Sequence, residues 1–236
     1  MFTKSAEYYD AIYAAVGKNY EQEAARLHSF IQTHKRTPDD TLLDIGCGTG
    51  AHLPYLRPFY TIEGLDLDAE ILAVAKQNFP DLAFHQGDMV DFNLGRAFAV
   101  VTCLFSSIGY VKTLPRLQQA IQNLARHTSP GGVVVIEPWF GPRVLQPGFL
   151  HALLVDQPKL KVARISRNEI EGNVSILNFH YLIATPEAVE YKTERHELGL
   201  FTHEESLAAF MASGLTVVHD SEGLDGRGLY IGIKSA

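Results

Sequence analysis

The chain has 236 residues, of which 46% are hydrophobic and 20% charged, a balance typical of a folded protein. Its net charge of −7 comes with no basic stripe, so binding to nucleic acid is not expected. Cys47 and Cys103 are too few for a disulfide scaffold or a cysteine-rich zinc site. No apolar run approaches the roughly 18 residues of a membrane span. Residues 1–7 lack the apolar core of a signal peptide, so a cytoplasmic protein is expected.

The segment from residue 20 to residue 137 alternates between the periodicities of helices and buried strands. We predict helices over 20–31, 69–78 and 114–124, and strands over 41–45, 60–65, 82–85, 98–104 and 133–137, with a turn at 129–132. Short buried strands separated by helices indicate a parallel sheet covered on both faces, a Rossmann-like α/β fold. Ligands of such sheets bind beyond the carboxyl ends of the strands, so the residues that follow each strand are the candidate site.

The pattern changes after residue 139. Alternating segments at 161–165, 174–183 and 189–200 predict an antiparallel β insert, within 140–201 of a single domain that spans 1–236. We expect this insert to cover the strand ends as a lid. Thr202 and Glu205 have the spacing of a capping box, which predicts a helix ending at Ala212. Two final strands are expected over 215–219 and 229–233.

A glycine-rich segment follows the first predicted strand. Gly46, Gly48 and Gly50 allow the backbone to approach a ligand closely. Gly46, Gly48 and Ala51 satisfy a dinucleotide fingerprint, so a nicotinamide dehydrogenase is one alternative. However, Asp44 would repel the pyrophosphate of a dinucleotide, whereas it would attract the sulfonium and ammonium groups of S-adenosylmethionine. The loop therefore favours the methyl donor.

Acidic residues follow the next two strands as well. Asp66 ends the second strand, where a carboxylate accepts hydrogen bonds from the ribose hydroxyls of either cofactor. Asp88 can accept from the adenine amino group, although a residue of this type also caps helices. Met89 offers the adenine ring an apolar face and a backbone amide. Asp88 and Met89 are not usual in nicotinamide enzymes at this place.

The loop at 46–50, with Asp66 and Asp88, resembles class I S-adenosylmethionine-dependent methyltransferases. A closer resemblance, spread over nearly the whole chain, is to the N,N-dimethyltransferases of nucleotide-linked amino sugars such as desosamine and mycaminose. It is carried by the segments 9–13, 17–20, 85–89, 105–109, 137–139 and 226–229. Members of that family often have His where Tyr110 stands and Trp where Phe140 stands, and both positions are expected to border the substrate.

This resemblance implies a seven-stranded core with an antiparallel insert over the site. It also implies two successive methylations of a sugar amine in natural product biosynthesis, with S-adenosyl-L-homocysteine as the product of the donor. The cofactor-binding residues that we predict are Tyr20, Asp44, Gly46, Cys47, Gly48, Gly50, Asp66, Leu67, Asp88 and Met89. Tyr20 is expected at the carboxylate end of the donor, and Cys47 is expected to fill space in the loop.

Methyl transfer is an in-line displacement from an activated donor, so the protein mainly holds nucleophile, methyl and sulfur in line. An amine needs an acceptor for one proton, whereas a hydroxyl needs a stronger base. Tyr13, on an N-terminal helix that by resemblance folds over the donor, and Tyr110, after the fourth strand, are candidates for orienting the amine, with a core role as the alternative. His180 is a third candidate, since it shares with Asn178 a strand face that could border the cleft.

Asn178 and four further residues are candidates for binding the acceptor. Glu137 follows the fifth strand and is expected either to hold a sugar hydroxyl or to act as a structural acceptor. Trp139 is expected to form a wall of the site or part of the core. Arg227, between two glycines, fits a clamp for the substrate pyrophosphate because arginine binds phosphate with two hydrogen bonds, and Arg143 is a second choice.

The sequence therefore predicts an S-adenosylmethionine-dependent enzyme that N-methylates, and by resemblance N,N-dimethylates, a nucleotide-linked amino sugar. The alternatives are an N- or O-methyltransferase for another small metabolite, a nicotinamide dehydrogenase, and a methyltransferase-like binding protein without activity. The expected partner is a small-molecule acceptor, without nucleic acid or membrane and with a homodimer left open. Neither a His-Glu-x-x-His nor a Cys-x-x-Cys motif occurs, so a metal is not expected.

Overall fold

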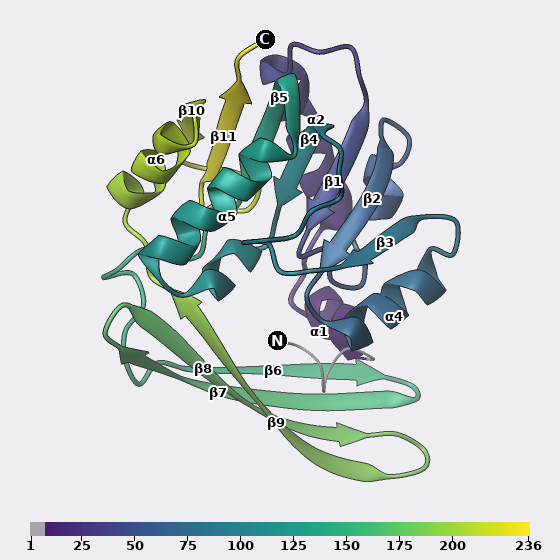
Figure 1. Cartoon of the computed structure of the whole chain (residues 1–236). Coiled ribbons are helices and arrows are strands. Elements are labelled where there is room, and N and C mark those ends of the chain that lie inside the picture. The colour runs from purple at the N-terminus through teal and green to yellow at the C-terminus, as the bar shows by residue number, and fades with distance from the viewer. Residues whose placement is uncertain (1–7) are drawn as a thin grey trace.

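Two β-sheets, one above the other in Figure 1, organise the chain in the computed structural model, which describes residues 8–236. The larger sheet has seven strands in the order β10-β11-β5-β4-β1-β2-β3. Only β11 and β10 run antiparallel to their neighbours. The strands are β1 (Thr41–Ile45), β2 (Thr61–Asp66), β3 (Ala83–Gln86), β4 (Phe98–Cys103), β5 (Thr128–Ile136), β10 (Leu215–Asp220) and β11 (Leu229–Lys234).

Helices cover both faces of the larger sheet (Figure 1). Residues of α5 (Leu114–Arg126) and α6 (His203–Ala212) form one core layer with the sheet, and residues of α2 (Tyr20–His34) and α3 (Leu53–Leu56) form another. The other helices are α1 (Tyr9–Ala15), α4 (Ala69–Asn78) and the 3₁₀ helix η2 (Ser107–Val111). In the described part of the chain, 8–236, none of the helices is long and apolar enough to cross a membrane.

The smaller sheet lies below the carboxyl ends of the parallel strands (Figure 1). Its order is β6-β7-β8-β9, and neighbouring strands are antiparallel. They are β6 (Leu150–Gln157), β7 (Leu160–Glu171), β8 (Val174–Ala184) and β9 (Val189–Gly199). Ile12 of α1 packs on Val155, Val162 and Tyr181 in a third apolar cluster, so the N-terminal helix lies against this sheet.

The seven-stranded α/β fold and the antiparallel sheet within 140–201 confirm the predicted architecture. The helix predicted over 69–78 has these bounds in the structure, and the capping box of Thr202 and Glu205 forms. The structure differs from the prediction in two places. No strand was predicted at β6, and residues 129–132 form no separate turn, since they belong to β5 where its register with β4 shifts.

A third correction concerns β8. Asn178 and His180 were expected to border the cleft, but it is the odd-numbered positions that face inward: Phe179 and Tyr181 are buried, whereas His180 is exposed. Both faces of this strand carry apolar residues, so the alternation of side chains alone does not show which face is covered.

Candidate active site

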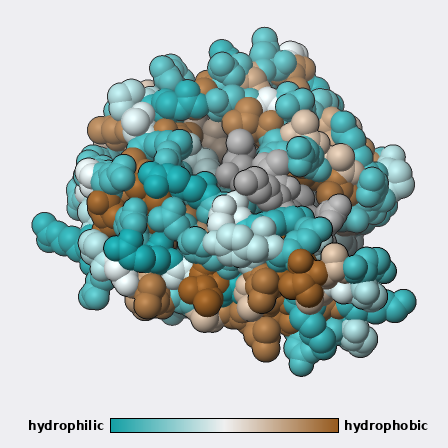
Figure 2. Space-filling view, turned by 90° about the horizontal axis from the view of Figure 1, so that it is seen from below, coloured by the Kyte–Doolittle hydropathy of each residue, from teal (hydrophilic) through white to brown (hydrophobic). Residues whose placement is uncertain are grey.

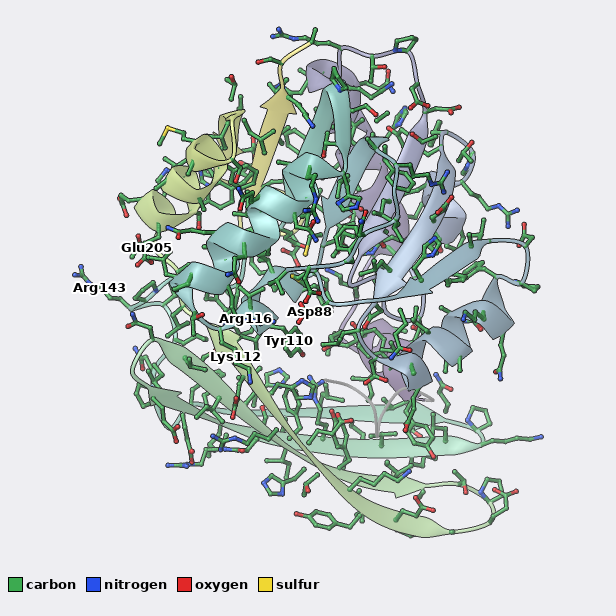
Figure 3. All side chains as sticks on the ribbon, viewed as in Figure 1. Asp88, Tyr110, Lys112, Arg116, Arg143 and Glu205 are labelled. Carbon is green, nitrogen blue, oxygen red and sulfur yellow. The ribbon has the colours of Figure 1, made fainter. Side chains whose placement is uncertain are left out.

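A cavity of about 840 Å³ lies between the carboxyl ends of the parallel strands and the inner face of the smaller sheet, a size typical of small-molecule sites. Figure 3 shows Asp88, Arg116 and Tyr110 in this region. Of the predicted residues, the lining includes Tyr13, Tyr20, Asp44, Gly46, Cys47, Gly48, Asp66, Leu67, Asp88, Met89, Tyr110, Trp139 and Arg227.

The glycine loop packs too tightly for side chains. Gly46 has φ +66°, and a Cβ there would lie 2.7 Å from Cβ of Ser107. Gly48 has φ +57°, and its N–H donates to Oδ2 of Asp66 at 3.0 Å. Both positions therefore need glycine, for the backbone conformation and, at Gly46, also for space.

Asp44 places a buried carboxyl group at the end of β1. Its Oδ1 accepts a hydrogen bond from Oγ1 of Thr102 at 2.7 Å. Burial raises the pKa of Asp44 to about 6, although the charge of His52 and the Thr102 hydrogen bond oppose this shift. A cation in the cavity would favour the ionised form, so this position suits the ammonium group of the methyl donor.

Tyr20 also fits the donor. Its side chain lines the cavity, and its buried hydroxyl has no hydrogen-bond partner among the described residues. Because an unpaired buried hydroxyl costs about 1–3 kcal/mol, a polar ligand atom is expected here. The place of Tyr20 at the carboxylate end of the donor stays a prediction.

Asp66 and Asp88 keep acceptor capacity toward the cavity. The two oxygens of Asp66 accept from the N–H groups of Gly48 and Asp68, each at 3.0 Å, and each retains a lone pair. Oδ1 of Asp88 accepts from Val90 N–H, and Oδ2 lies 2.7 Å from Nη2 of Arg116. The loop thus faces three carboxyl groups, which suit a cationic nucleoside better than a pyrophosphate.

Tyr13 and the missed residue Arg164 form part of the opposite wall. The Tyr13 ring meets the Phe105 ring edge to face, with 4.8 Å between centroids. The Arg164 guanidinium lies 5.8 Å from the Tyr13 centroid and 4.6 Å from that of Phe179. Arg164 is 7% exposed, and its Nε and Nη1 have no partner among the described residues. Burial raises the pKa of Tyr13, and the charge and hydrogen bond of Arg164 partly offset this.

Tyr110 borders the cavity together with His196, which the sequence analysis did not consider. The Tyr110 hydroxyl lies 2.7 Å from Nδ1 of His196. The two residues are 86 positions apart in the sequence, on η2 and β9, so only the tertiary fold brings them together.

Arg227 lines the cavity but is already held by carboxylates. Its guanidinium pairs with Asp225, lies 3.3 Å from Oε1 of Glu137, and donates to Oγ of Ser106 at 2.8 Å. Glu137 is fully buried, does not line the cavity, and accepts from the N–H of Phe105 at 2.6 Å. Burial raises the pKa of Glu137, against the opposing charge of Arg227. These contacts match the structural alternative for Glu137.

Trp139 is both a wall and an anchor, since it lines the cavity while its Nε1–H donates to Oγ of Ser175 at 2.8 Å. Gly50, Asn178, His180 and Arg143 are not among the residues that line the cavity. A Cβ on Gly50 would meet the Phe79 ring at 2.8 Å, so this glycine serves packing. Arg143 points away from the site at the edge of the molecule (Figure 3).

Comparison with known proteins identifies the family. A family model described as a methyltransferase domain matches residues 42–132. The dTDP-3-amino-3,6-dideoxy-alpha-D-glucopyranose N,N-dimethyltransferase of Streptomyces fradiae is 42% identical over 233 residues, which cover 98% of this chain and 91% of that protein.

Two solved structures extend this similarity to the fold. Streptomyces venezuelae DesVI has a TM-score of 0.92 and 38% identity, covering 98% of both chains. CalS10 from Micromonospora echinaspora, an amino pentose methyltransferase solved with S-adenosylmethionine bound, has a TM-score of 0.87 and 35% identity, covering 96% of both. These similarities exclude the dehydrogenase alternative. The chain therefore belongs to the N,N-dimethyltransferases of nucleotide-linked amino sugars, enzymes that use S-adenosylmethionine as the methyl donor.

Proposed function

We propose that this enzyme transfers methyl groups twice to the amino group of a sugar linked to a nucleoside diphosphate. The observation that carries the proposal is that one cavity holds the loop suited to the donor and, on another wall, Tyr13 and Tyr110. The donor supplies an electrophilic methyl group. The protein residues orient the amine toward it, and the smaller sheet excludes water as a lid of the single domain.

Arg164 is our assignment for the phosphate contact. It is buried at the cavity, and two of its guanidinium nitrogens, Nε and Nη1, lack partners among residues 8–236, whereas the charge of Arg227 is already balanced by Asp225 and Glu137. If Arg227 were the clamp, as the sequence suggested, the phosphates would have to compete with these carboxylates. Arg164→Met should therefore raise the KM for the nucleotide sugar at least tenfold and leave the affinity for S-adenosylhomocysteine unchanged.

The activity is tested by incubating the purified enzyme with S-adenosylmethionine and dTDP-linked amino sugars. The panel should carry the amine at C3, as in the substrate named for the S. fradiae relative, or at C4. We expect mass spectrometry to show one and then two added methyl groups on at least one sugar. Methylation of hydroxylated sugars alone would overturn the N-methyl assignment, and turnover of neither class would overturn the substrate.

We further propose a homodimer formed by the outer face of the smaller sheet. Leu154, Leu182 and Tyr191 lie in one row across this sheet and are 64%, 52% and 65% exposed. Figure 2 views the molecule from this side and shows apolar patches among polar residues. A twofold axis would let one such row pack against its copy.

Light scattering should give twice the chain mass for this enzyme, and Leu182→Asp should give the monomer. A monomeric wild type would exclude the proposed interface. We also place the enzyme in the cytoplasm, where the buried thiols of Cys47 and Cys103 stay reduced.

A further inference from the structure

Tyr110 is the first member of a hydrogen-bonded series that leads from the cavity into the smaller sheet. Its hydroxyl lies 2.7 Å from Nδ1 of His196, and Nε2 of His196 lies 3.4 Å from Oε2 of Glu194. The hydroxyl of Tyr181 donates to the same Glu194 oxygen at 3.1 Å. His196 and Glu194 are both buried. Tyr110 and His196 line the cavity, whereas Glu194 lies behind them.

The chemistry of these groups fixes the direction of the hydrogen bonds. A carboxylate only accepts, so the proton of neutral His196 is on Nε2, facing Glu194. Nδ1 then carries no proton and acts as the acceptor, so the Tyr110 hydroxyl must donate to it. Tyr110 therefore presents only oxygen lone pairs to the cavity. This arrangement suits an ammonium group, which donates hydrogen bonds, better than a group that can only accept them.

We propose that Tyr110 and His196 form a proton relay, oriented by Glu194, that removes one proton from the sugar ammonium before each methyl transfer. The ammonium N–H gives its proton to Tyr110 Oη while the Tyr110 proton moves to Nδ1 of His196. The products are a neutral amine and an imidazolium, so charge is conserved. This inference rests on the proposed function and assigns its proton acceptor.

Each round needs one such transfer. The starting ammonium loses a proton and accepts the first methyl group, and the resulting secondary ammonium loses a proton before it accepts the second. The imidazolium returns its proton through Tyr110 when the cavity opens to water. Tyr110 touches the substrate and is the catalytic residue, whereas His196 and Glu194 act through it as positioning residues.

The surroundings of His196 keep it ready to accept. Burial lowers its pKa, which the hydrogen bond from Nε2–H to Glu194 partly offsets. Among residues 8–236, the side chains that face the imidazole include Glu194 on its own strand, Phe179 of β8, Arg164 of β7 and Tyr110 of η2. Arg164 disfavours the imidazolium and Glu194 favours it, so the neutral form prevails until a proton arrives from the substrate.

The test is the pH dependence of single-turnover methylation by His196→Asn, which leaves an amide oxygen near the position of Nδ1. A sugar amine is expected to titrate near pH ~8, like an α-amino group. At about pH 6.5 we expect the variant to be roughly 10²-fold slower than the wild type, and at about pH 9, where the amine arrives neutral, less than tenfold slower. Tyr110→Phe should show the same profile, and the double variant should be no slower than either one.

His180→Asn is the matched control, since the structure places His180 on the outer face of this sheet, 2.5 Å from the hydroxyl of Tyr191. Its pH profile should equal that of the wild type. Tyr110→His in the His196→Asn background places an imidazole at the cavity and should restore the rate near about pH 6.5.

A defect of equal size at every pH, or no defect, would overturn the relay. If His196→Asn loses affinity for S-adenosylhomocysteine, Glu194→Gln provides the same test with the imidazole in place, and we expect the same pH-dependent loss. Failure of the proposed function is distinct, because the wild type itself would then transfer no methyl group to any amino sugar.

Discussion

The carboxyl group of Asp44 is buried where its ionisation costs free energy in the ligand-free enzyme. Its pKa in the folded chain, about 6, lies above the ordinary value of 3.8. The stability contributed by this group is therefore fully present below that ordinary value and is lost as pH rises through about 6. Near neutral pH, binding of the donor ammonium beside Asp44 would compensate for this loss.

Asp44→Asn should separate these two effects. At about pH 8 the ligand-free variant should have a free energy of unfolding about 2 kcal/mol above that of the wild type, with a higher melting temperature. This gain should disappear toward about pH 4. Its affinity for S-adenosylhomocysteine should fall at least tenfold, because an amide cannot pair with an ammonium charge. Thermal melts across pH and calorimetry provide the measurements. A variant that is less stable at every pH would show that the Thr102 hydrogen bond outweighs the cost of burying the charge.

The steric role of Gly46 can be tested by comparison with a glycine that has the same backbone conformation. Gly46 has φ +66° and Gly95 has φ +67°, but only a Cβ on Gly46 would clash, at 2.7 Å from Ser107, whereas a Cβ on Gly95 would meet open space. Gly95→Ala should cost about 1 kcal/mol for the left-handed backbone alone. Gly46→Ala should cost more and should also abolish measurable binding of S-adenosylhomocysteine. Equal melting temperatures and affinities for the two variants would exclude the steric role.

Residue types at strand ends were sufficient to predict much of one wall of the cavity. Asp44 and Asp66 lie at the carboxyl ends of β1 and β2, Asp88 follows β3, and such ends converge at one edge of a sheet. Arg164 and His196 could not be predicted in this way. Each is a polar residue within a strand of the insert, and its partners Tyr13 and Tyr110 come from distant segments.

At the scale of elements, periodicity predicted the parallel sheet but only part of the insert. The segment 150–157 has adjacent leucines instead of regular alternation, so β6 gave no clear strand signal. The strand β8 was predicted, but apolar residues occupy both of its faces, and the covered face is decided by contact with α1 and the cavity.

Neighbouring positions on β8 give a test of this orientation. Leu177 lines the cavity, whereas Asn178 does not. Leu177→Ala should raise the KM for the nucleotide sugar about tenfold by loss of apolar contact, with little change in affinity for S-adenosylhomocysteine. Asn178→Ala should leave steady-state kinetics within about twofold of the wild type. A larger effect of Asn178→Ala than of Leu177→Ala would mean that β8 presents its opposite face to the cavity in the working enzyme.

At the scale of the whole molecule, a series of charges joins distant parts of the chain around the site. Nζ of Lys18 lies 2.7 Å from Oε1 of Glu23 and 3.3 Å from Oδ2 of Asp225. Glu23 also binds His52, next to the glycine loop, and Asp225 binds Arg227. The series thus ties the N-terminal segment, which carries Tyr13 and Tyr20, to the C-terminal loop.

Lys18→Met should therefore affect both stability and donor binding. Lys18 and Glu23 are both buried, with side chains 7% and 6% exposed, so we expect a loss of about 3 kcal/mol in the free energy of unfolding. Arg57→Met is the control: it breaks a contact of 2.6 Å with Asp81, but both side chains are about half exposed, so the loss should stay within about 0.5 kcal/mol. Urea unfolding measures both losses.

The loss of stability in Lys18→Met should depend on pH, whereas a loss caused by packing alone should not. Burial opposes ionisation of Glu23, but hydrogen bonds from His52 and Lys18 prevail and hold its pKa below the ordinary value of 4.5. The stability from this lowered pKa is present above 4.5 and is lost as pH falls through the folded pKa. The difference between Lys18→Met and the wild type should therefore shrink in acid as Glu23 is protonated. The KM for S-adenosylmethionine should rise with the loss of stability, because Tyr20 and the glycine loop are held by the same charges. A stability difference that is constant with pH, with an unchanged KM, would show that Lys18 contributes only its packing.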